Sequence, residues 1–539
     1  MTTQTSKECP EIFSHPAWLD RAVGYQIYPQ SFQDSNGDGI GDLPGILSRV
    51  DALADLGVNL IWLSPIYDSP FLDAGYDVRD FKAVAPRYGT LADLDRLIEA
   101  LHARGMRLML DLVPGHTSID HPWFLESCKH VPNPYTHRFV WTNSMYQTPE
   151  GTGAGFLQGY GEREGAVATN FFWSQPKLNY GVLDPNPAKS WELPFDHPDV
   201  QSLWAEMFDI IRFWLDRGVD GFRIDSAKSI CPDHPPLGEG RFYRELREIF
   251  DQEYPDAALL TEWGWPCDAL ATGVHADFLL HNNRAFNELF SLPGWENGVP
   301  EPVFSEQGGD VGRFLQHYLP HHADRHGGLI CMMSGNHDYM RCGTSRSLDQ
   351  LKGLFTFLLT MPALPMIYYG DEVGMPNVTG LTSKEGGFRR TGCRTPMPWD
   401  AADGFSSAPR AEWYLPPHAD PGDRTVAAQK GRADSLRTHV QHLIQFRKTH
   451  PALEPDAAWV PLLEDGPTLL YRRGEGSDAL VVLVHPCQSE RSLTLRDVPP
   501  DALGGKTLNP QLSRGVTVTK SGEALQLAPA SFAVFARNV

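Results

Sequence analysis

The stretch WLDRGVDGFRID (214–225) shows the unit from which the fold is built: an amphipathic helix stops at Gly218 and an apolar strand follows at once. Apolar residues upstream recur at helical spacing, and the glycine supplies the left-handed residue that ends a helix. Arg223 and Asp225 are two residues apart in the strand, so both project from the same face. A charged pair on one face of a buried strand calls for a functional explanation.

The same helix–glycine–strand unit occurs twice earlier, in LADLGVNLIWLSP (53–65) and LHARGMRLMLDLVP (101–114). Further apolar strands are predicted in AVGYQIYP (22–29), AALLTEWG (257–264), ADFLLHN (276–282), GGLICMMSGNHD (327–338) and LPMIYYGDE (364–372). Strands that alternate with helices and are rich in Val, Ile and Leu indicate a parallel sheet buried on both faces. Eight such units predict an α/β fold, the (β/α)8 TIM barrel, whose catalytic residues lie at the carboxyl ends of the strands.

Uneven spacing of the units predicts two additions to the barrel. We assign residues 1–116 and 197–452 to the catalytic barrel. Residues 117–196, rich in Gly, Pro, Asn and aromatics, form an inserted lobe after the third strand, and long ordered loops of this kind usually serve a site. Residues 453–539 change to short alternating runs and are predicted to form a C-terminal antiparallel β-sandwich.

Bulk properties exclude several classes of function. The net charge of −21, with no long basic patch, argues against nucleic acid as a partner. The N-terminus lacks the pattern of a signal peptide, so we expect a cytoplasmic protein. The most hydrophobic run, GLFTFLLTMPALPMIYYG (353–370), is broken by prolines, so we expect no membrane span. The eight cysteines form no C-x-x-C pair and are expected to be reduced thiols. The sequence makes no prediction of oligomeric state.

Acidic and polar side chains follow four of the predicted strands, at residues 111–116, 223–225, 262 and 336–338. A single Asp after a strand is usually a helix cap, but four clusters that meet at one barrel mouth are hard to explain as caps. Carboxylates without a metal-spaced His pair or a Ser/His pattern suit glycoside hydrolysis, in which one carboxylate attacks and another donates a proton. Asp225 and Glu262, on adjacent strands ~4.8 Å apart, fit the ~5 to 5.5 Å separation of a retaining mechanism.

The chain resembles the α-amylase family of glycoside hydrolases (family 13), and within it the α-glucosidase and oligo-1,6-glucosidase branch. The resemblance covers nearly the whole chain and rests on motifs in family order: DAGYDVRD, DLVPGHTS, QPKLN, GFRIDSAK, LLTEWG, SGNHD and RTPMPWD. It implies that Asp225 is the nucleophile, Glu262 the general acid/base and Asp338 a stabiliser of the transition state.

The resemblance also implies a set of substrate-binding residues. His116 and His337 match family contacts to glucose hydroxyls, while Asp73, Tyr76 and Arg394 match residues that pair across the end of the pocket and stack on the terminal sugar. A pocket closed in this way implies trimming from the non-reducing end. Arg223 is expected to hydrogen-bond Asp225, hold it ionised and fix its rotamer; a purely structural ion pair is the alternative, although desolvation makes such pairs weak stabilisers.

The stretch DSNGDGIGD (34–42) offers oxygens in the order of the start of a calcium loop, but its twelfth position is Gly45, so the bidentate Glu is missing. Family relatives use a similar short loop for one structural Ca²⁺ or Mg²⁺. The expected ligands are Asp34, Asn36, Asp38, the Ile40 carbonyl and Asp42. A metal-free Asx turn is the alternative. No organic cofactor is expected.

Three positions depart from the family pattern. Gly115 stands where relatives usually carry the Asn that binds a second calcium, which puts that second site in doubt. Lys177 replaces an Asp common among oligo-1,6-glucosidases, and Ser226 replaces the Val that follows their nucleophile. Both changes favour α-1,4 over isomaltose-type links, although a methyl-scale change is worth only about 1–3 kcal/mol.

These observations predict a retaining, exo-acting α-glucosidase that hydrolyses short maltose-like or sucrose-like oligosaccharides through a covalent β-glucosyl-enzyme on Asp225. The first alternative is an α-glucosyltransferase or disaccharide isomerase with the same active site, in which a sugar rather than water captures the intermediate. The remote alternative is a non-catalytic barrel that serves as a partner subunit. A secreted endo-amylase would also carry these motifs, but the pocket-closing residues argue against it.

Overall fold

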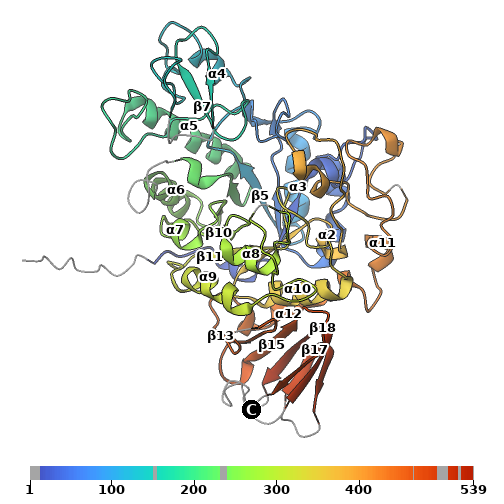
Figure 1. Cartoon of the computed structure of the whole chain (residues 1–539). Helices are drawn as coiled ribbons and strands as arrows, with labels where there is room; N and C mark the ends of the chain where they lie inside the picture. Colours follow the sequence, from blue (N-terminus) through green and yellow to red (C-terminus); the bar gives the residue numbers. More distant parts are fainter. Residues whose placement is uncertain are drawn as a thin grey trace, which may run out of the picture.

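The structure is a computed structural model that describes residues 12–149, 155–230, 240–295, 297–402, 404–464, 466–494, 508–519 and 524–537. Eight parallel strands close into a barrel at the centre of the molecule (Figure 1). They are β1 (Gly24–Ile27), β2 (Leu60–Leu63), β5 (Arg107–Leu112), β8 (Gly221–Ile224), β9 (Ala258–Thr261), β10 (Ala276–Leu279), β11 (Leu329–Met333) and β12 (Leu364–Tyr368). The predicted barrel is therefore confirmed, and each strand lies within the stretch that predicted it.

Helices surround the barrel and return the chain between strands. The longer ones are α2 (Val50–Leu56), α3 (Leu91–His102), α5 (Pro198–Leu215), α6 (Gly240–Glu253), α8 (Arg284–Phe290), α9 (Val311–Ala323), α10 (Leu348–Thr360) and α12 (Leu436–Thr449). Helix α5 begins with Pro198, has His197 as its N-cap, and is followed by Gly218 at φ 102°, a left-handed turn that leads into β8. Short helices α1 (Leu43–Ser48), α7 (Pro266–Leu270) and α11 (Val426–Gln429) complete this layer.

Alternate residues of the barrel strands face its interior. In β2, Leu60 and Trp62 belong to an interior cluster with Phe278 of β10, whose ring lies 5.4 Å from that of Trp62. In β8, Phe222 and Ile224 belong instead to the larger core that includes the surrounding helices. Because successive side chains of a strand point to opposite faces, Arg223 must face the inside of the barrel.

An irregular lobe lies between β5 and β8, at the top of Figure 1. It contains α4 (Pro122–Ser127) and a hairpin of β6 (Gly155–Gln158) with β7 (Ala166–Thr169). A second hairpin, β3 (Tyr67–Asp68) with β4 (Asp80–Val84), follows β2. The lobe returns to the carboxyl end of β5, where the Leu178 amide donates to the Gly115 carbonyl. This contact holds the lobe beside the barrel mouth.

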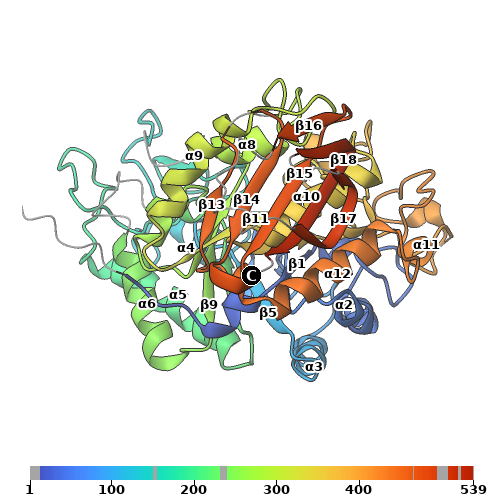
Figure 2. The same ribbon diagram turned by 90° about the horizontal axis from the view of Figure 1, so that it is seen from below.

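The C-terminal part is an antiparallel sheet that packs on the opposite side of the barrel from the lobe (Figures 1 and 2). Its strands are β13 (Trp459–Pro461), β14 (Leu469–Arg473), β15 (Leu480–His485), β16 (Arg491–Thr494), β17 (Leu508–Val518) and β18 (Ala524–Arg537). The long β18 pairs with β15, β16 and β17, so the described strands form one curled sheet. The expectation of a C-terminal antiparallel domain is confirmed, and the described strands form one curled sheet where a sandwich of two sheets was expected.

The predictions of reduced cysteines and of no membrane span can be compared with the structure. The six described cysteines form no disulfide, while Cys9 and Cys231 lie outside the described residues. In the part of the chain that is described, no helix is long and apolar enough to cross a membrane.

Candidate active site

Charged side chains from three neighbouring strands meet on one guanidinium. Arg223 of β8 is 1% exposed; its Nη1 donates to Asp111 of β5 at 2.7 Å and to Asp225 at 2.8 Å, and its Nη2 lies 2.8 Å from Glu262 Oε2. The predicted contact between Arg223 and Asp225 is present, and it extends to two further carboxylates. Asp225 and Glu262 are therefore held on adjacent nitrogens of one planar group.

Local backbone geometry supports this arrangement. Ser226 follows Asp225 with φ 41°, an unusual conformation for a residue other than glycine. In that conformation its amide donates to Glu262 Oε2 at 2.8 Å. Strain of this kind persists where the surroundings enforce it and gathers at functional sites. Here it ties the residue after one carboxylate to the other carboxylate.

Burial dominates the titration of this group. It raises the pKa values of Asp225 and Glu262 to about 7 each, although Arg223 opposes the shift in both. Asp111 is raised to about 7 for the same reason. Arg223 was expected to hold Asp225 ionised; it does lower the pKa of Asp225, but burial outweighs it because three buried carboxylates share one cation. Near neutral pH the group retains a proton, which a general acid needs.

Asp338, after β11, has the opposite electrostatics. Burial alone would raise its pKa, but His337, Arg390 and Arg394 together hold it well below the usual range. Arg394 Nη2 donates to Asp338 Oδ1 at 2.9 Å, and Arg390 binds the same oxygen. His337 Nε2 lies 3.1 Å from Asp338 Oδ2. Asp338 is thus the carboxylate that stays ionised at any pH near neutrality.

Both predicted histidines lie at the barrel mouth, fully buried and with pKa values lowered by burial to about 4, so both are neutral. The Gln26 amide donates to His337 Nδ1 at 2.8 Å, which leaves Nε2 as the proton-bearing nitrogen that faces Asp338. His116 accepts from Asn170 at Nδ1 and donates from Nε2 to the Tyr76 carbonyl at 3.0 Å. Contact of either histidine with a sugar remains a prediction.

The other predicted substrate residues close the inner end of the cavity in a different pattern from the one expected. Asp73 accepts from Gln175 at 2.7 Å and lies 3.8 Å from Arg390, whereas the ion pair of Arg394 is with Asp338. Asp73 and Arg394 therefore act on each other through their charges, without a direct ion pair. The Tyr76 ring stacks on His337 at 5.1 Å, and its hydroxyl donates to Asp111 at 3.0 Å.

These groups surround a cavity of about 600 Å³ that opens between the barrel and the lobe. Aromatic side chains of the outer part are Phe171, Phe172, Trp265 and Trp295. A polar floor with aromatic walls suits a sugar, whose hydroxyls need hydrogen bonds and whose C–H faces stack on rings.

Two residues of the site were missed by sequence reasoning. Arg390, in the loop before Arg394, has no distinguishing signal there. Asp277 of β10 does, because it is a charge within an apolar strand; unlike Arg223 it lies on the outer face, since its neighbours Ala276 and Phe278 belong to the interior cluster. Asp277 Oδ1 accepts from Thr261 Oγ1 at 2.7 Å and from the Trp263 amide at 2.9 Å, and its Oδ2 from the Gly264 amide at 3.1 Å. It thereby binds the side chain of the residue before Glu262 and the backbone of the two residues after it.

The predicted metal loop is closed by its own hydrogen bonds. Asp34 accepts from the amides of Asn36, Gly37 and Gly39 and from Ser406, and Asp42 accepts from Ser35 and Gly45. Among described residues, the carboxylates of this loop are not gathered within 4.8 Å of one another. The carboxylates as placed do not by themselves surround a divalent ion, and no step of the proposed reaction depends on one. Ca²⁺ or Mg²⁺ in this loop stays a prediction.

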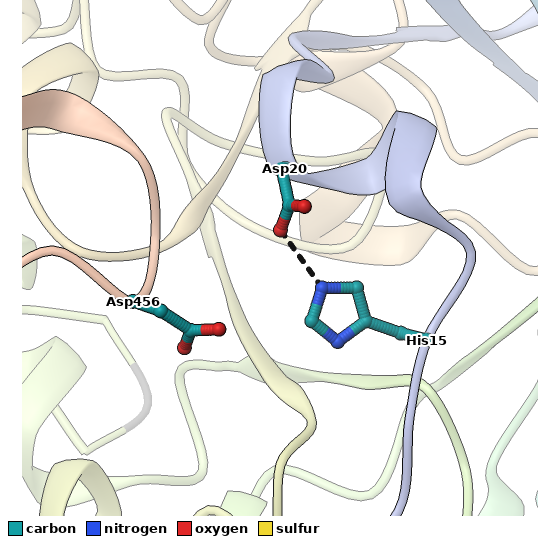
Figure 3. Close-up of side chains that lie close together, drawn as sticks. All are labelled: His15, Asp20 and Asp456. Atoms are coloured by element: carbon teal, nitrogen blue, oxygen red, sulfur yellow. Dashed lines mark hydrogen bonds and ion pairs between the residues drawn. The ribbon is translucent and has the colours of Figure 1, made fainter. Parts of the chain in front are cut away.

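A different cluster with ligand atoms within 4.8 Å of one another, His15, Asp20 and Asp456, is found in the described residues (Figure 3). His15 faces two acceptors, Asp20 Oδ1 at 2.9 Å and the Gly327 carbonyl at 3.0 Å, and Asp456 lies 3.3 Å from Arg325. These contacts explain the cluster as a charge network beside the start of the barrel.

The chain matches the family model described as alpha amylase, catalytic domain, over residues 26–456. It therefore belongs to the α-amylase family, glycoside hydrolase family 13. It is 32% identical to the trehalose synthase/amylase TreS of Mycobacterium tuberculosis over 521 residues, covering 87% of this chain and 81% of that protein. It is 31% identical to the oligo-1,6-glucosidase of Halalkalibacterium halodurans over 536 residues, covering 86% and 90%.

Among solved structures, the fold is similar to an isomaltulose synthase mutant from Erwinia rhapontici NX5 in complex with its natural substrate sucrose. The TM-score is 0.79 and the identity 26%, over 96% of this chain and 99% of that one. Together these similarities identify an enzyme of the α-amylase family that acts on α-glucosides.

Proposed function

We propose that the protein is a retaining, exo-acting α-glucosidase for short oligosaccharides. The observation that carries the proposal is the Arg223 guanidinium, which holds Asp225 and Glu262 together beneath a cavity whose inner end is closed by ion pairs. Two adjacent carboxylates are the requirement of a retaining mechanism. A closed inner end admits only the terminal sugar of a chain.

In the first step, Asp225 attacks the anomeric carbon as Glu262 gives its proton to the oxygen of the departing group, so that the glycosidic bond breaks and a glucosyl–Asp225 ester forms. In the second step, Glu262 removes a proton from water, which attacks the same carbon and releases Asp225. The pKa of Glu262 near 7 suits a group that must give and then take a proton. Asp338, held ionised, balances the positive charge that develops on the sugar ring.

The second candidate is a glucosyltransferase or disaccharide isomerase, which differs only in what attacks the glucosyl–Asp225 ester. The similarities to a trehalose synthase/amylase and an isomaltulose synthase favour this alternative. We further propose a preference for α-1,4 links, which rests on Ser226 and Lys177. A cytoplasmic location is also part of the proposal.

The test is incubation of the protein, and of an Asp225→Ala control, with maltose, sucrose, isomaltose and trehalose, with all products separated by chromatography. Glucose without new oligosaccharides supports the hydrolase and identifies its linkage. New disaccharides or longer products assign the protein to the transferase or isomerase class. Equal turnover by Asp225→Ala, or none by either protein, would overturn the assignment and favour the non-catalytic barrel.

A further inference from the structure

The charged residues that line the cavity differ in depth, with exposed cations at its mouth. Its carboxylates are Asp73, Asp225, Glu262 and Asp338, and its cations are Lys228, Arg389 and Arg390. Arg390 is occupied by Asp338 and by the Gly386 carbonyl. Lys228 and Arg389 are exposed, so they lie at the mouth, on the side where a departing or accepting group must sit once a terminal sugar fills the closed end.

Lys228 is close to the reacting groups in sequence and, in the part of the chain that the structure describes, has no anionic partner. It stands three residues after Asp225, in the short 3₁₀ helix Ala227–Ile230. Its Nζ lies 5.0 Å from the centre of the Trp265 ring, and among described residues it makes no hydrogen bond or ion pair. A lysine over a ring keeps its charge available to a ligand that reaches the same ring.

Arg389 is held in place by a backbone carbonyl and an aromatic ring. Its Nη2 donates to the Gly294 carbonyl at 2.7 Å, and its guanidinium lies 5.9 Å from the Trp295 ring. Trp295 in turn packs at 5.6 Å on Tyr339, the neighbour of Asp338. No carboxylate among the described residues pairs with Arg389, and its other donors remain free to bind.

These two cations stand out because the protein as a whole is strongly acidic, with 67 Asp and Glu against 46 Lys and Arg. A neutral sugar does not require unpaired charge at the mouth, whereas an anion does. Guanidinium and ammonium groups bind carboxylate and phosphate oxygens through charge-assisted hydrogen bonds. Flanking indole rings would hold the carbon skeleton of the same group.

We propose that the departing or accepting group is anionic, a small alcohol or sugar that carries a carboxylate or a phosphate, bound between Lys228 and Arg389. The proposal rests on the proposed function, since it places this group outside the glucosyl site. It changes the expected substrate from a neutral oligosaccharide to an α-glucoside of an acidic alcohol or of a sugar phosphate.

The experiment compares kcat/KM for two matched pairs of substrates. One pair is α-glucosyl-glycerate and α-glucosyl-glycerol, which differ only in a carboxylate; the other is maltose with and without a phosphate on its reducing-end glucose. The readout is the ratio of anionic to neutral substrate within each pair. A preference of at least about fivefold for the anionic member of one pair is expected, and the pair that shows it distinguishes carboxylate from phosphate.

Lys228→Met and Arg389→Gln keep much of the side-chain length and remove the charge. Each is expected to lower the ratio by about fivefold, whereas Lys430→Met, an exposed lysine that does not line the cavity, leaves the ratio unchanged. A ratio near one in the wild-type protein, or variants that lower both rates equally, would overturn the proposal. A neutral 4-nitrophenyl α-glucoside separates the two claims, because failure to hydrolyse it would overturn the proposed function and the inference together, whereas its hydrolysis without any anionic preference would overturn the inference alone.

Discussion

At the scale of single residues, the site is governed by one cation that is shared among three buried carboxylates. Arg223 cannot neutralise Asp111, Asp225 and Glu262 at once, so this group of carboxylates stabilises one added proton. Asp338 has the opposite situation, with Arg390, Arg394 and His337 around a single carboxylate. The same residue type therefore serves as a proton carrier at one strand end and as a fixed negative charge at another.

The pH dependence of stability follows from these shifts. Folding raises the pKa of Glu262 from 4.5 to about 7, so between those values the folded protein binds more protons than the unfolded chain. The stabilisation is complete below pH 4.5 and is lost as the pH rises through 7. We expect Glu262→Gln, which does not titrate, to lose less unfolding free energy than the wild type between pH 5 and 8 in urea titrations. Identical losses in the two proteins would contradict the shift.

Much of this site could be predicted at the residue level, for a physical reason. Asp225, Glu262 and Asp338 each follow an apolar strand, and a barrel brings strand ends together whatever their distance in sequence. Arg390 could not be found in this way, because its position depends on the path of a loop with no periodic pattern. The direct pairing of Asp73 with Arg394 was wrong for the same reason: Arg390 from that loop lies between the expected partners in the ion-pair network.

At the scale of elements, the end of β9 is held by its neighbour β10. Asp277 accepts three hydrogen bonds from residues 261, 263 and 264, which flank Glu262. Asp277 does not reach the reacting atoms, and its role is to position Glu262.

Asp277→Asn replaces an acceptor with an amide that cannot accept all three bonds. We expect kcat to fall by about tenfold and the alkaline limb of kcat/KM to move, because Glu262 changes its surroundings. Thr261→Val, which removes only the side-chain bond, serves as the milder control. An unchanged pH profile together with a lowered melting temperature would assign Asp277 a purely structural role.

The loop of residues 34–42 is an element whose pattern fits two structures. Its Asx turns satisfy the carboxylates without an ion, and the same residues carry the predicted Ca²⁺ or Mg²⁺. If the loop binds metal, the purified protein should contain about one equivalent by elemental analysis, and EDTA should lower its melting temperature. Asp38→Ala should abolish both effects. Absence of metal and an unchanged melting temperature in EDTA would decide for the metal-free turn.

At the scale of the whole molecule, the C-terminal sheet is joined to the barrel through α10. Thr360 bonds the Tyr471 hydroxyl at 2.6 Å, Arg514 pairs with Asp349, and a Cβ on Gly353 would lie 3.3 Å from Val484. Glycine inside a helix costs stability unless something must approach it closely, and here β15 does. The sheet therefore supports a helix of the barrel at the end remote from the lobe.

Gly353→Leu should force α10 and β15 apart. We expect a loss of about 1–3 kcal/mol in the free energy of unfolding, measured by calorimetry or denaturant titration. Gly353→Ala is the matched control, in which helix propensity and mild crowding nearly cancel. A Leu variant as stable as the wild type would show that the contact between sheet and helix is loose.

The barrel could be predicted from the sequence because its strands are apolar and its helices end at glycine, so local and global preferences agree. The arrangement of the C-terminal strands could not, since alternation predicts strands and leaves open whether they form one curled sheet or two. β18 runs over fourteen residues and pairs with three strands, and no local sequence pattern predicts this pairing.

If Asp225 carries the sugar during the reaction, the glycosyl–enzyme intermediate can be trapped on its side chain. The protein is treated with 5-fluoro-α-glucosyl fluoride, whose ring fluorine slows release of the glycosyl group, and is then digested and analysed by mass spectrometry. We expect one label, on the peptide that contains Asp225, and none in Asp225→Asn. A label on another carboxylate, such as Asp111 or Asp338, or fluoride release without any labelled peptide, would contradict it.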